Sequence, residues 1–253
     1  MYIINCCDLR LQVPLDQGTA DISGEQLTSG YTCSMVDSMV GFYNYTVIIT
    51  YLSLVSASLG MMFSSQGKFK AALACLIISG LCDMIDGPVA RTRKRTDLEK
   101  KFGVQIDSLC DCISFGIQPG VLVYFIAVYM SDNKALEIVG LAVAICFALC
   151  AVIRLAYFNV TEEERMEKEG SKKRTGYQGL PVTNVALIIP GLYNARYFAS
   201  ENGLVFSIIM IAGLAITAFL FVYDFKMFKL NGKKLIPVGI FGALILVGCF
   251  FTP

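Results

Sequence analysis

Four aspartates in the middle of the chain have the spacing of a metal-binding or acid–base site. Asp83 and Asp86 stand three residues apart at the end of one apolar stretch, and Asp107 and Asp111 stand four residues apart near the start of the next. On helices, each pair shares one face. Ionisable groups inside such stretches are costly and usually functional, and four close carboxylates repel unless cations lie between them. Oxygen ligands of this kind favour Mg²⁺ or Mn²⁺ over zinc.

The composition excludes several other kinds of catalysis. The 253 residues include no histidine, which excludes Ser-His-Asp and Cys-His catalysis and HExxH metalloproteases. The ten cysteines are scattered and form no CxxC pair, and cysteine in an apolar stretch behaves as a small hydrophobic residue. Two metal ions held by shared carboxylates are the usual arrangement for displacement at phosphorus. The aspartates therefore predict phosphoryl-group chemistry.

The elements that must position these aspartates are membrane-spanning helices. Hydrophobic residues make up 55% of the chain and charged residues 16%, whereas about 25% of a soluble protein is charged. Seven apolar stretches are long enough to cross a ~30 Å hydrocarbon layer as helices. They lie near Tyr45–Phe63, Phe69–Ala90, Gly103–Tyr129, Leu136–Phe158, Leu180–Tyr197, Leu204–Tyr223 and Leu235–Phe251. We predict an all-α fold, a polytopic membrane helical bundle of about seven transmembrane helices.

The charged loops predict the orientation of this bundle. Fifteen basic residues follow the second, fourth and sixth stretches, against four in the loops of the opposite side. The positive-inside rule places the fifteen basic residues, and with them the aspartates, at the cytoplasmic face of the membrane. If the source is prokaryotic, this membrane is the cytoplasmic membrane. We expect three parts: a weakly ordered N-terminal extension at 1–40, a membrane domain at 41–230 and an additional C-terminal transmembrane helix at 231–253.

The aspartates belong to a longer motif, D-x-x-D-G-x-x-A-R, a gap, then G-x-x-x-D-x-x-x-D. This order of residues resembles the motif of the CDP-alcohol phosphatidyltransferases. The fixed positions are Asp83, Asp86, Gly87, Ala90, Arg91, Gly103, Asp107 and Asp111. The gap of eleven residues is slightly longer than usual, and we interpret it as a charged loop. The run D-S-x-x-D-x-x-S-F-G-x-x-P from Asp107 to Pro119, with Arg154–Asn159 and Gly179–Pro181, resembles the phosphatidylserine synthase branch of that family.

This resemblance implies an enzyme that transfers the phosphatidyl group of CDP-diacylglycerol to L-serine, giving phosphatidylserine and CMP. It implies two Mg²⁺ or Mn²⁺ ions held by Asp83, Asp86, Asp107 and Asp111, with Asp111 as the general base. The residues implied to bind CDP are Asp83, Gly87, Ala90, Arg91 and Gly103. The implied partners are the two substrates, the lipid bilayer and a second copy of the chain, with no nucleic acid.

Three questions stay open on the sequence alone. A serine pocket needs a cation, for which Arg154 is the best candidate, with Asn159 nearby, but glycerol 3-phosphate and inositol are competing acceptors within the family. Gly87, Ala90 and Gly103 are small enough to open a groove for a nucleotide, although small residues also serve plain helix packing. Outside the family, a carboxylate-lined cation transporter is the alternative, because intramembrane aspartates also mark ion pathways.

Overall fold

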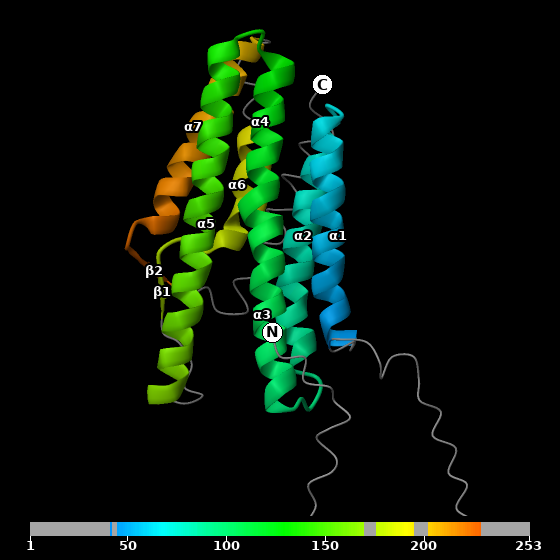
Figure 1. The fold of residues 1–253 in the computed structure, drawn as a ribbon, viewed down its shortest axis with the longest axis vertical. Helices are drawn as coiled ribbons and strands as arrows, with labels where there is room; N and C mark the ends of the chain where they lie inside the picture. The colour runs from blue at the N-terminus through cyan, green and yellow to red at the C-terminus, as the bar shows by residue number, and fades with distance from the viewer. Residues whose placement is uncertain (1–40, 42–44, 170–175, 195–201, 229–253) are drawn as a thin grey trace, which may run out of the picture. The chain divides into compact units, whose positions relative to one another are not determined.

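The chain separates into two units, residues 1–40 and 41–253. The computed structural model describes residues 41, 45–169, 176–194 and 202–228, all within the second unit. They form helices and one two-stranded ladder (Figure 1). In chain order the elements are α1 (Tyr45–Ser65), α2 (Phe69–Ala90), α3 (Asp97–Asp111), the π-helical segment η3 (Cys112–Ile117), α4 (Gln118–Met130), α5 (Lys134–Glu169), β1 (Gly176–Gln178), the short 3₁₀ turn η4 (Val182–Asn184), α6 (Val185–Asn194), α7 (Gly203–Val222) and β2 (Lys226–Phe228).

Among the described residues, five helical stretches are long and apolar enough to cross a membrane. They are Val47–Ser65, Phe69–Ala90, Asp97–Met130, Lys134–Lys168 and Gly203–Val222. These stretches match five of the predicted spans and confirm the all-α membrane bundle. The predicted span Leu180–Tyr197 contains a shorter apolar helix, Val182–Asn194. The predicted span Leu235–Phe251 lies outside the described residues, as do the predicted extension 1–40 and the whole segment 231–253.

The helix that carries Asp107 and Asp111 begins earlier than the sequence predicted. α3 starts at Asp97 instead of near Gly103, so the second half of the gap interpreted as a loop is helical. The cause is a capping box, in which Thr96 Oγ1 accepts the Glu99 N–H at 3.2 Å and the Glu99 carboxylate accepts the Thr96 N–H at 2.8 Å. The capping box fixes the start of the helix on which the two aspartates lie.

α5 also extends past its predicted end near Phe158 and continues to Glu169, through residues that were interpreted as a loop. Its last turns are stabilised by the ion pairs Arg165–Glu162 and Lys168–Glu164. Such pairs, three or four residues apart on a helix surface, support helix formation where the apolar pattern has ended. The acidic and basic residues that suggested a loop therefore form a helix.

Between α3 and α4 the chain stays helical but changes its hydrogen-bonding register in η3. This segment begins directly after Asp111, and its central residues Ser114, Phe115 and Gly116 are buried. π-helical turns are rare and occur mostly as single turns within α-helices, often at functional sites. The aspartates of α3 and the apolar residues of α4 are therefore in different helical registers.

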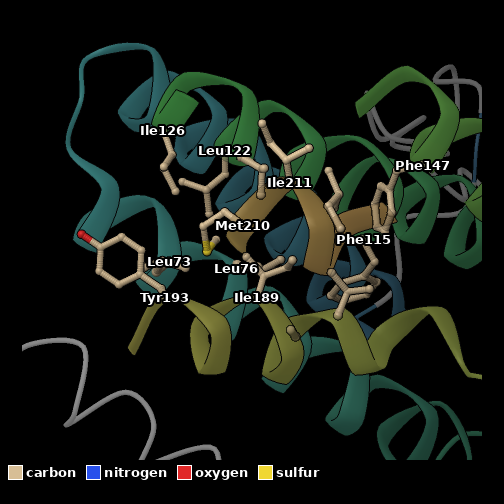
Figure 2. Packing of buried hydrophobic residues seen from close by; sticks show 14 of the residues in the cluster. Leu73, Leu76, Phe115, Leu122, Ile126, Phe147, Ile189, Tyr193, Met210 and Ile211 are labelled. Atoms are coloured by element: carbon tan, nitrogen blue, oxygen red, sulfur yellow. The ribbon is translucent and has the colours of Figure 1, made fainter. Parts of the chain in front are cut away.

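The core lies where α2, α4, α6 and α7 meet. Figure 2 shows Leu73 and Leu76 of α2, Leu122 of α4, Ile189 of α6 and Met210 of α7 among the buried side chains of this cluster. Phe147 of α5 packs against Phe221 of α7 with their ring centroids 5.4 Å apart. These contacts hold the second half of the bundle together. The turn between α2 and α3 lies at one end of the bundle, away from this core (Figure 1).

α1 is apolar outside and polar inside. Ile48, Leu52, Val55 and Leu59 are exposed and form one stripe along the helix. The buried face carries hydroxyl groups instead, at Thr50, Ser53 and Ser56. This arrangement suits a helix in lipid, where apolar side chains face the hydrocarbon and polar groups pair with neighbouring helices.

The ladder of β1 and β2 joins the segment before η4 to the segment after α7. The strands are antiparallel, with Gly176 opposite Phe228 and Gln178 opposite Lys226. Gly179 follows β1 with a φ of +68°, and its N–H donates to the Phe225 carbonyl at 2.6 Å. A left-handed backbone of this kind favours glycine. The ladder and this turn place Gly179 against α5.

Candidate active site

The four aspartates converge at the end of the bundle where α2 stops and α3 begins. One carboxylate oxygen from each of Asp83, Asp86 and Asp107 lies within 4.8 Å of the others. The Asp111 side chain lies within hydrogen-bonding distance of Asp83, and the Asp107 side chain within that distance of Asp86. Asp86 is only 9% exposed. The structure therefore brings together the four side chains that the sequence predicted as metal ligands.

This cluster fits a divalent cation by its donor chemistry. Negative charges this close together in a partly buried site repel strongly, and removing them from water is costly unless they are compensated. Carboxylate oxygens are the ligands that Mg²⁺ and Mn²⁺ prefer. The residues present thus fit the metal site that the family implies, and the number of ions that they hold stays a prediction.

α1 holds the two carboxylate-bearing helices in place. It packs along the length of α2 and also contacts α3 and η3, whereas α2 and α3 approach each other only sparsely. Asp83 and Asp86 therefore meet Asp107 and Asp111 between two helices that are both packed on a third.

Gly87 directly follows Asp86 on α2 and faces open space. A Cβ at position 87 would have no heavy atom of the described residues within 4 Å. At Gly80, two turns earlier on α2, a Cβ would lie 2.7 Å from the Ala186 Cβ of α6. Close packing of α6 on α2 therefore explains a glycine at position 80 but not at position 87. Ala90 and Arg91 follow at the end of α2, where Arg91 is exposed.

Gly87→Ala is therefore expected to leave the fold intact and to weaken nucleotide binding. The methyl group has room, so the free energy of unfolding should change by no more than about 1 kcal/mol. The family motif assigns position 87 to CDP binding, so the methyl group is expected to meet the CDP moiety; overpacking of a close contact costs about 1–3 kcal/mol, which is roughly tenfold or more in the apparent KM for CDP-diacylglycerol. Thermal unfolding and steady-state CMP release would measure both effects.

Gly80→Ala is the matched control, because it should lower the unfolding temperature without a specific change in that KM. An unchanged KM in Gly87→Ala would show that the open space at position 87 is not the nucleotide groove.

Arg95, in the turn between α2 and α3, is a basic residue near the site that is not part of the family motif. Its Nη1 lies 3.2 Å from the position of a Cβ on Gly103. Gly103 and Asp107 are four residues apart and share a face of α3. Arg95 therefore adds positive charge one helical turn from the carboxylates, beside a glycine that the family motif assigns to CDP binding.

α5 lies alongside the helix that carries Asp107 and Asp111. Asn159 Nδ2 donates to Ser108 Oγ at 2.7 Å, directly beside Asp107 in sequence. About two helical turns further along, a Cβ on Gly116 would lie 3.2 Å from the Ala151 Cβ. These two contacts fix the antiparallel register of α5 against α3 and η3, and they place one of the two predicted acceptor residues next to the cluster.

Arg154, the other predicted acceptor residue, lies between these contacts on α5. The register places it opposite Ile113, about 3 Å along the helix axis from Asp111. Arg154 is 9% exposed, and its guanidinium lies 3.3 Å from the position of a Cβ on Gly179. Arg154 is thus a buried cation at the level of the carboxylates, backed by the Gly179 turn.

Thr50 is a second residue that the motif did not indicate. Its Oγ1 donates to Asp86 Oδ2 at 3.3 Å across the α1–α2 interface. The sequence contains a signal for it, since hydroxyl residues recur at Thr50, Ser53 and Ser56 in an apolar stretch. The sequence does not show which helix these hydroxyls contact.

Fold and site together define an integral membrane protein with an acidic, metal-type site at one end of a helical bundle. A sequence profile of the CDP-alcohol phosphatidyltransferase family matches residues 43–219. The chain belongs to the CDP-alcohol phosphatidyltransferase family and is a phosphatidyltransferase. This membership replaces the alternative of a cation transporter.

Several characterised proteins are similar over most of the chain. A CDP-diacylglycerol–serine O-phosphatidyltransferase of Helicobacter pylori is 29% identical over 210 residues, 81% of this chain and 82% of the relative. An archaetidylserine synthase of Methanothermobacter thermautotrophicus is 33% identical over 171 residues, 68% of this chain and 66% of the relative. A CDP-diacylglycerol–serine O-phosphatidyltransferase of Saccharomyces cerevisiae is 31% identical over 177 residues, 68% of this chain and 54% of the relative.

Proposed function

We propose that this chain transfers the phosphatidyl group of CDP-diacylglycerol to the hydroxyl of L-serine, forming phosphatidylserine and CMP. The observation that carries the proposal is the cluster of Asp83, Asp86, Asp107 and Asp111, of which the last two belong to the run from Asp107 to Pro119. The names of the similar proteins support serine as the alcohol, since all three contain it although the lipids differ.

In this proposal the four aspartates hold two divalent cations. When bound, these ions would supply positive charge to the diphosphate and to the departing CMP. Asp111 takes the proton of the serine hydroxyl, whose oxygen then forms a bond to the phosphorus that bears diacylglycerol. The bond between this phosphorus and the CMP oxygen breaks, so no covalent enzyme intermediate is needed.

The remaining roles in this proposal are those that the family motif implies. Gly87, Ala90 and Gly103 leave room for the CDP moiety near the helix backbones, and Arg91 neutralises phosphate oxygens. Asp83 also contacts the CDP moiety. The acyl chains stay in lipid, and the head group enters from the side of the α2–α3 turn. The excess of basic residues on that side supports a cytoplasmic site, which labelling of single cysteines in intact cells would check.

Arg154 is the proposed partner of the serine carboxylate. A guanidinium can pair with a carboxylate through two parallel hydrogen bonds. Arg154 is buried, level with Asp111 and backed by Gly179. Asn159 is hydrogen-bonded to Ser108, the residue that follows Asp107 in the sequence. Serine bound between these side chains would present its hydroxyl to the carboxylates.

The acceptor is tested by CMP release from CDP-diacylglycerol in detergent with serine, glycerol 3-phosphate or inositol. We expect CMP release with serine and not with glycerol 3-phosphate or inositol. Release with glycerol 3-phosphate and not with serine would contradict the acceptor and leave the family chemistry in place. The proposed homodimer is checked by light scattering of the solubilised protein.

Arg154→Lys is expected to raise the apparent KM for serine strongly and to leave the KM for CDP-diacylglycerol nearly unchanged. Lysine keeps the charge but lacks the planar fork. Loss of this charge-assisted pairing should cost about 1.5–3 kcal/mol of binding free energy. The measurement is steady-state CMP release with each substrate varied in turn.

Arg165→Lys serves as the matched control, because Arg165 lies on the same helix and pairs with Glu162 near its end. It should alter neither KM. If Arg154→Lys raises both KM values equally, Arg154 supports the fold and the serine carboxylate binds elsewhere.

A further inference from the structure

α1 bears none of the motif residues, yet hydrogen bonds connect it to Asp86 on α2 and to Ser114 in η3, the segment that directly follows α3. Its buried face carries Thr50, Ser53 and Ser56, each at most 8% exposed. Every one of these hydroxyls is bonded to another helix. Because α1 packs on both α2 and α3, these bonds could set where the carboxylates lie.

The bonds at Ser53 join three elements. Ser53 Oγ donates to the Ser79 carbonyl at 3.3 Å, and Ser79 Oγ donates to the Ser53 carbonyl at 2.9 Å, so α1 and α2 are paired in both directions. Ser53 Oγ also lies 3.4 Å from Ser114 Oγ in η3. One turn further, Ser56 Oγ donates to the Cys75 carbonyl at 2.9 Å. These contacts fix the register of α1 against α2.

Thr50 is the last member of this series and the one that reaches the site. It is 6% exposed, and it donates from Oγ1 to Asp86 Oδ2 at 3.3 Å. Asp86 is itself 9% exposed and one of the three carboxylates that lie within 4.8 Å of one another. A buried hydroxyl therefore contacts a buried carboxylate of the cluster from outside the motif.

We propose that Thr50 is a positioning residue for Asp86. Its hydroxyl holds Oδ2 and so fixes the orientation of the Asp86 carboxylate beside Asp83 and Asp107, where a divalent cation would bind. Hydrogen-bond donors behind a ligating carboxylate orient it, and their loss typically weakens metal binding by about 10–100-fold. The inference rests on the proposed function only in that the cluster binds a divalent cation, and it holds for any acceptor alcohol.

The test is a Mn²⁺ titration of the detergent-solubilised protein, followed by electron paramagnetic resonance without substrate. Thr50→Val keeps the shape and removes the hydroxyl, and it should weaken Mn²⁺ binding by about 10–100-fold. Thr50→Ser restores the donor and should recover most of the affinity. Wild-type affinity in Thr50→Val would overturn the proposal, as would a failure of Thr50→Ser to bind better than Thr50→Val.

Two controls on α1 separate positioning from packing. Ser56→Ala removes a bond to α2 distant from the cluster, so it should lower thermal stability without weakening Mn²⁺ binding. Ser58→Ala removes only a bond to the Leu54 carbonyl of the same helix and should change neither. If Ser56→Ala weakens binding as much as Thr50→Val, the effect is one of packing and the proposal is wrong.

Asp107→Asn distinguishes failure of the inference from failure of the proposed function. It should reduce Mn²⁺ binding more than any α1 variant. If Asp107→Asn binds Mn²⁺ as the wild type does, the metal site itself is wrong, and the positioning role of Thr50 falls with it.

Discussion

Asp111→Asn should abolish CMP release from CDP-diacylglycerol while the protein stays folded in the membrane. Asparagine keeps the size of the side chain but cannot take the proton of the acceptor hydroxyl. Loss of general-base catalysis alone costs about 10²–10⁴-fold in rate, and the loss of one carboxylate from the cluster adds to this. The rate is measured as CMP release, and the fold is checked by thermal unfolding and size-exclusion chromatography.

Asp97→Asn is the matched control for this variant. Asp97 lies at the start of the same helix, is 92% exposed and pairs with Lys100 at 2.9 Å. Surface pairs of this kind contribute about 0–1 kcal/mol, so the replacement should be nearly silent. Near-normal turnover in Asp111→Asn would show that another group takes the proton.

Thorough chelation with EDTA should stop turnover, and Mg²⁺ or Mn²⁺ should restore it. The four aspartates concentrate negative charge in a partly buried site, and metal ions contribute several kcal/mol to displacement at phosphorus. Ligand binding to the folded state also stabilises it, by about 2.7 kcal/mol at one hundred times the Kd. Mn²⁺ should therefore raise the unfolding temperature of the stripped protein, and this effect needs no substrate.

EDTA already saturated with Mg²⁺ is the control for chelator effects on the detergent and the lipid, and it should leave turnover unchanged. Asp86→Asn should lose most of the thermal stabilisation by Mn²⁺. Full turnover after exhaustive chelation would contradict the metal-assisted mechanism.

The carboxylate cluster was predictable because helical periodicity pairs the aspartates and the alternating direction of the spans places both pairs at one end of the bundle. Asp83 and Asp86, three apart, and Asp107 and Asp111, four apart, must each share a helix face. Two consecutive spanning helices run in opposite directions, so their pairs meet at one end of the bundle. The structure brings these side chains within hydrogen-bonding distance, as this argument expects.

The helix boundaries were less predictable because charge density was taken as a sign of loops. The run from Asp97 to Lys101 has four charged residues in five, yet Thr96 and Glu99 form a capping box that starts a helix there. This signal is readable in the sequence. In α5, Glu162 and Arg165 likewise form a helix-supporting pair.

Contacts between helices distant in the sequence were beyond a single sequence. Thr50 and Asp86 are 36 residues apart, and Asn159 and Ser108 are 51 apart. Their meeting depends on the rotation of each helix about its axis, which packing decides. The pairing of β1 with β2 could not be predicted either, because a three-residue strand is too short to show a periodic pattern.

The π-helical segment between Asp111 and Gln118 divides the third spanning helix into a catalytic half and a structural half with different angular phases. Each residue of an α-helix turns the chain by about 100°. A chain one residue shorter in this segment could keep its carboxylates facing Asp83 and Asp86, or keep Leu122 and Ile126 in the core, but not both. The number of residues between Asp111 and Gln118 is therefore under tighter restriction than their identities.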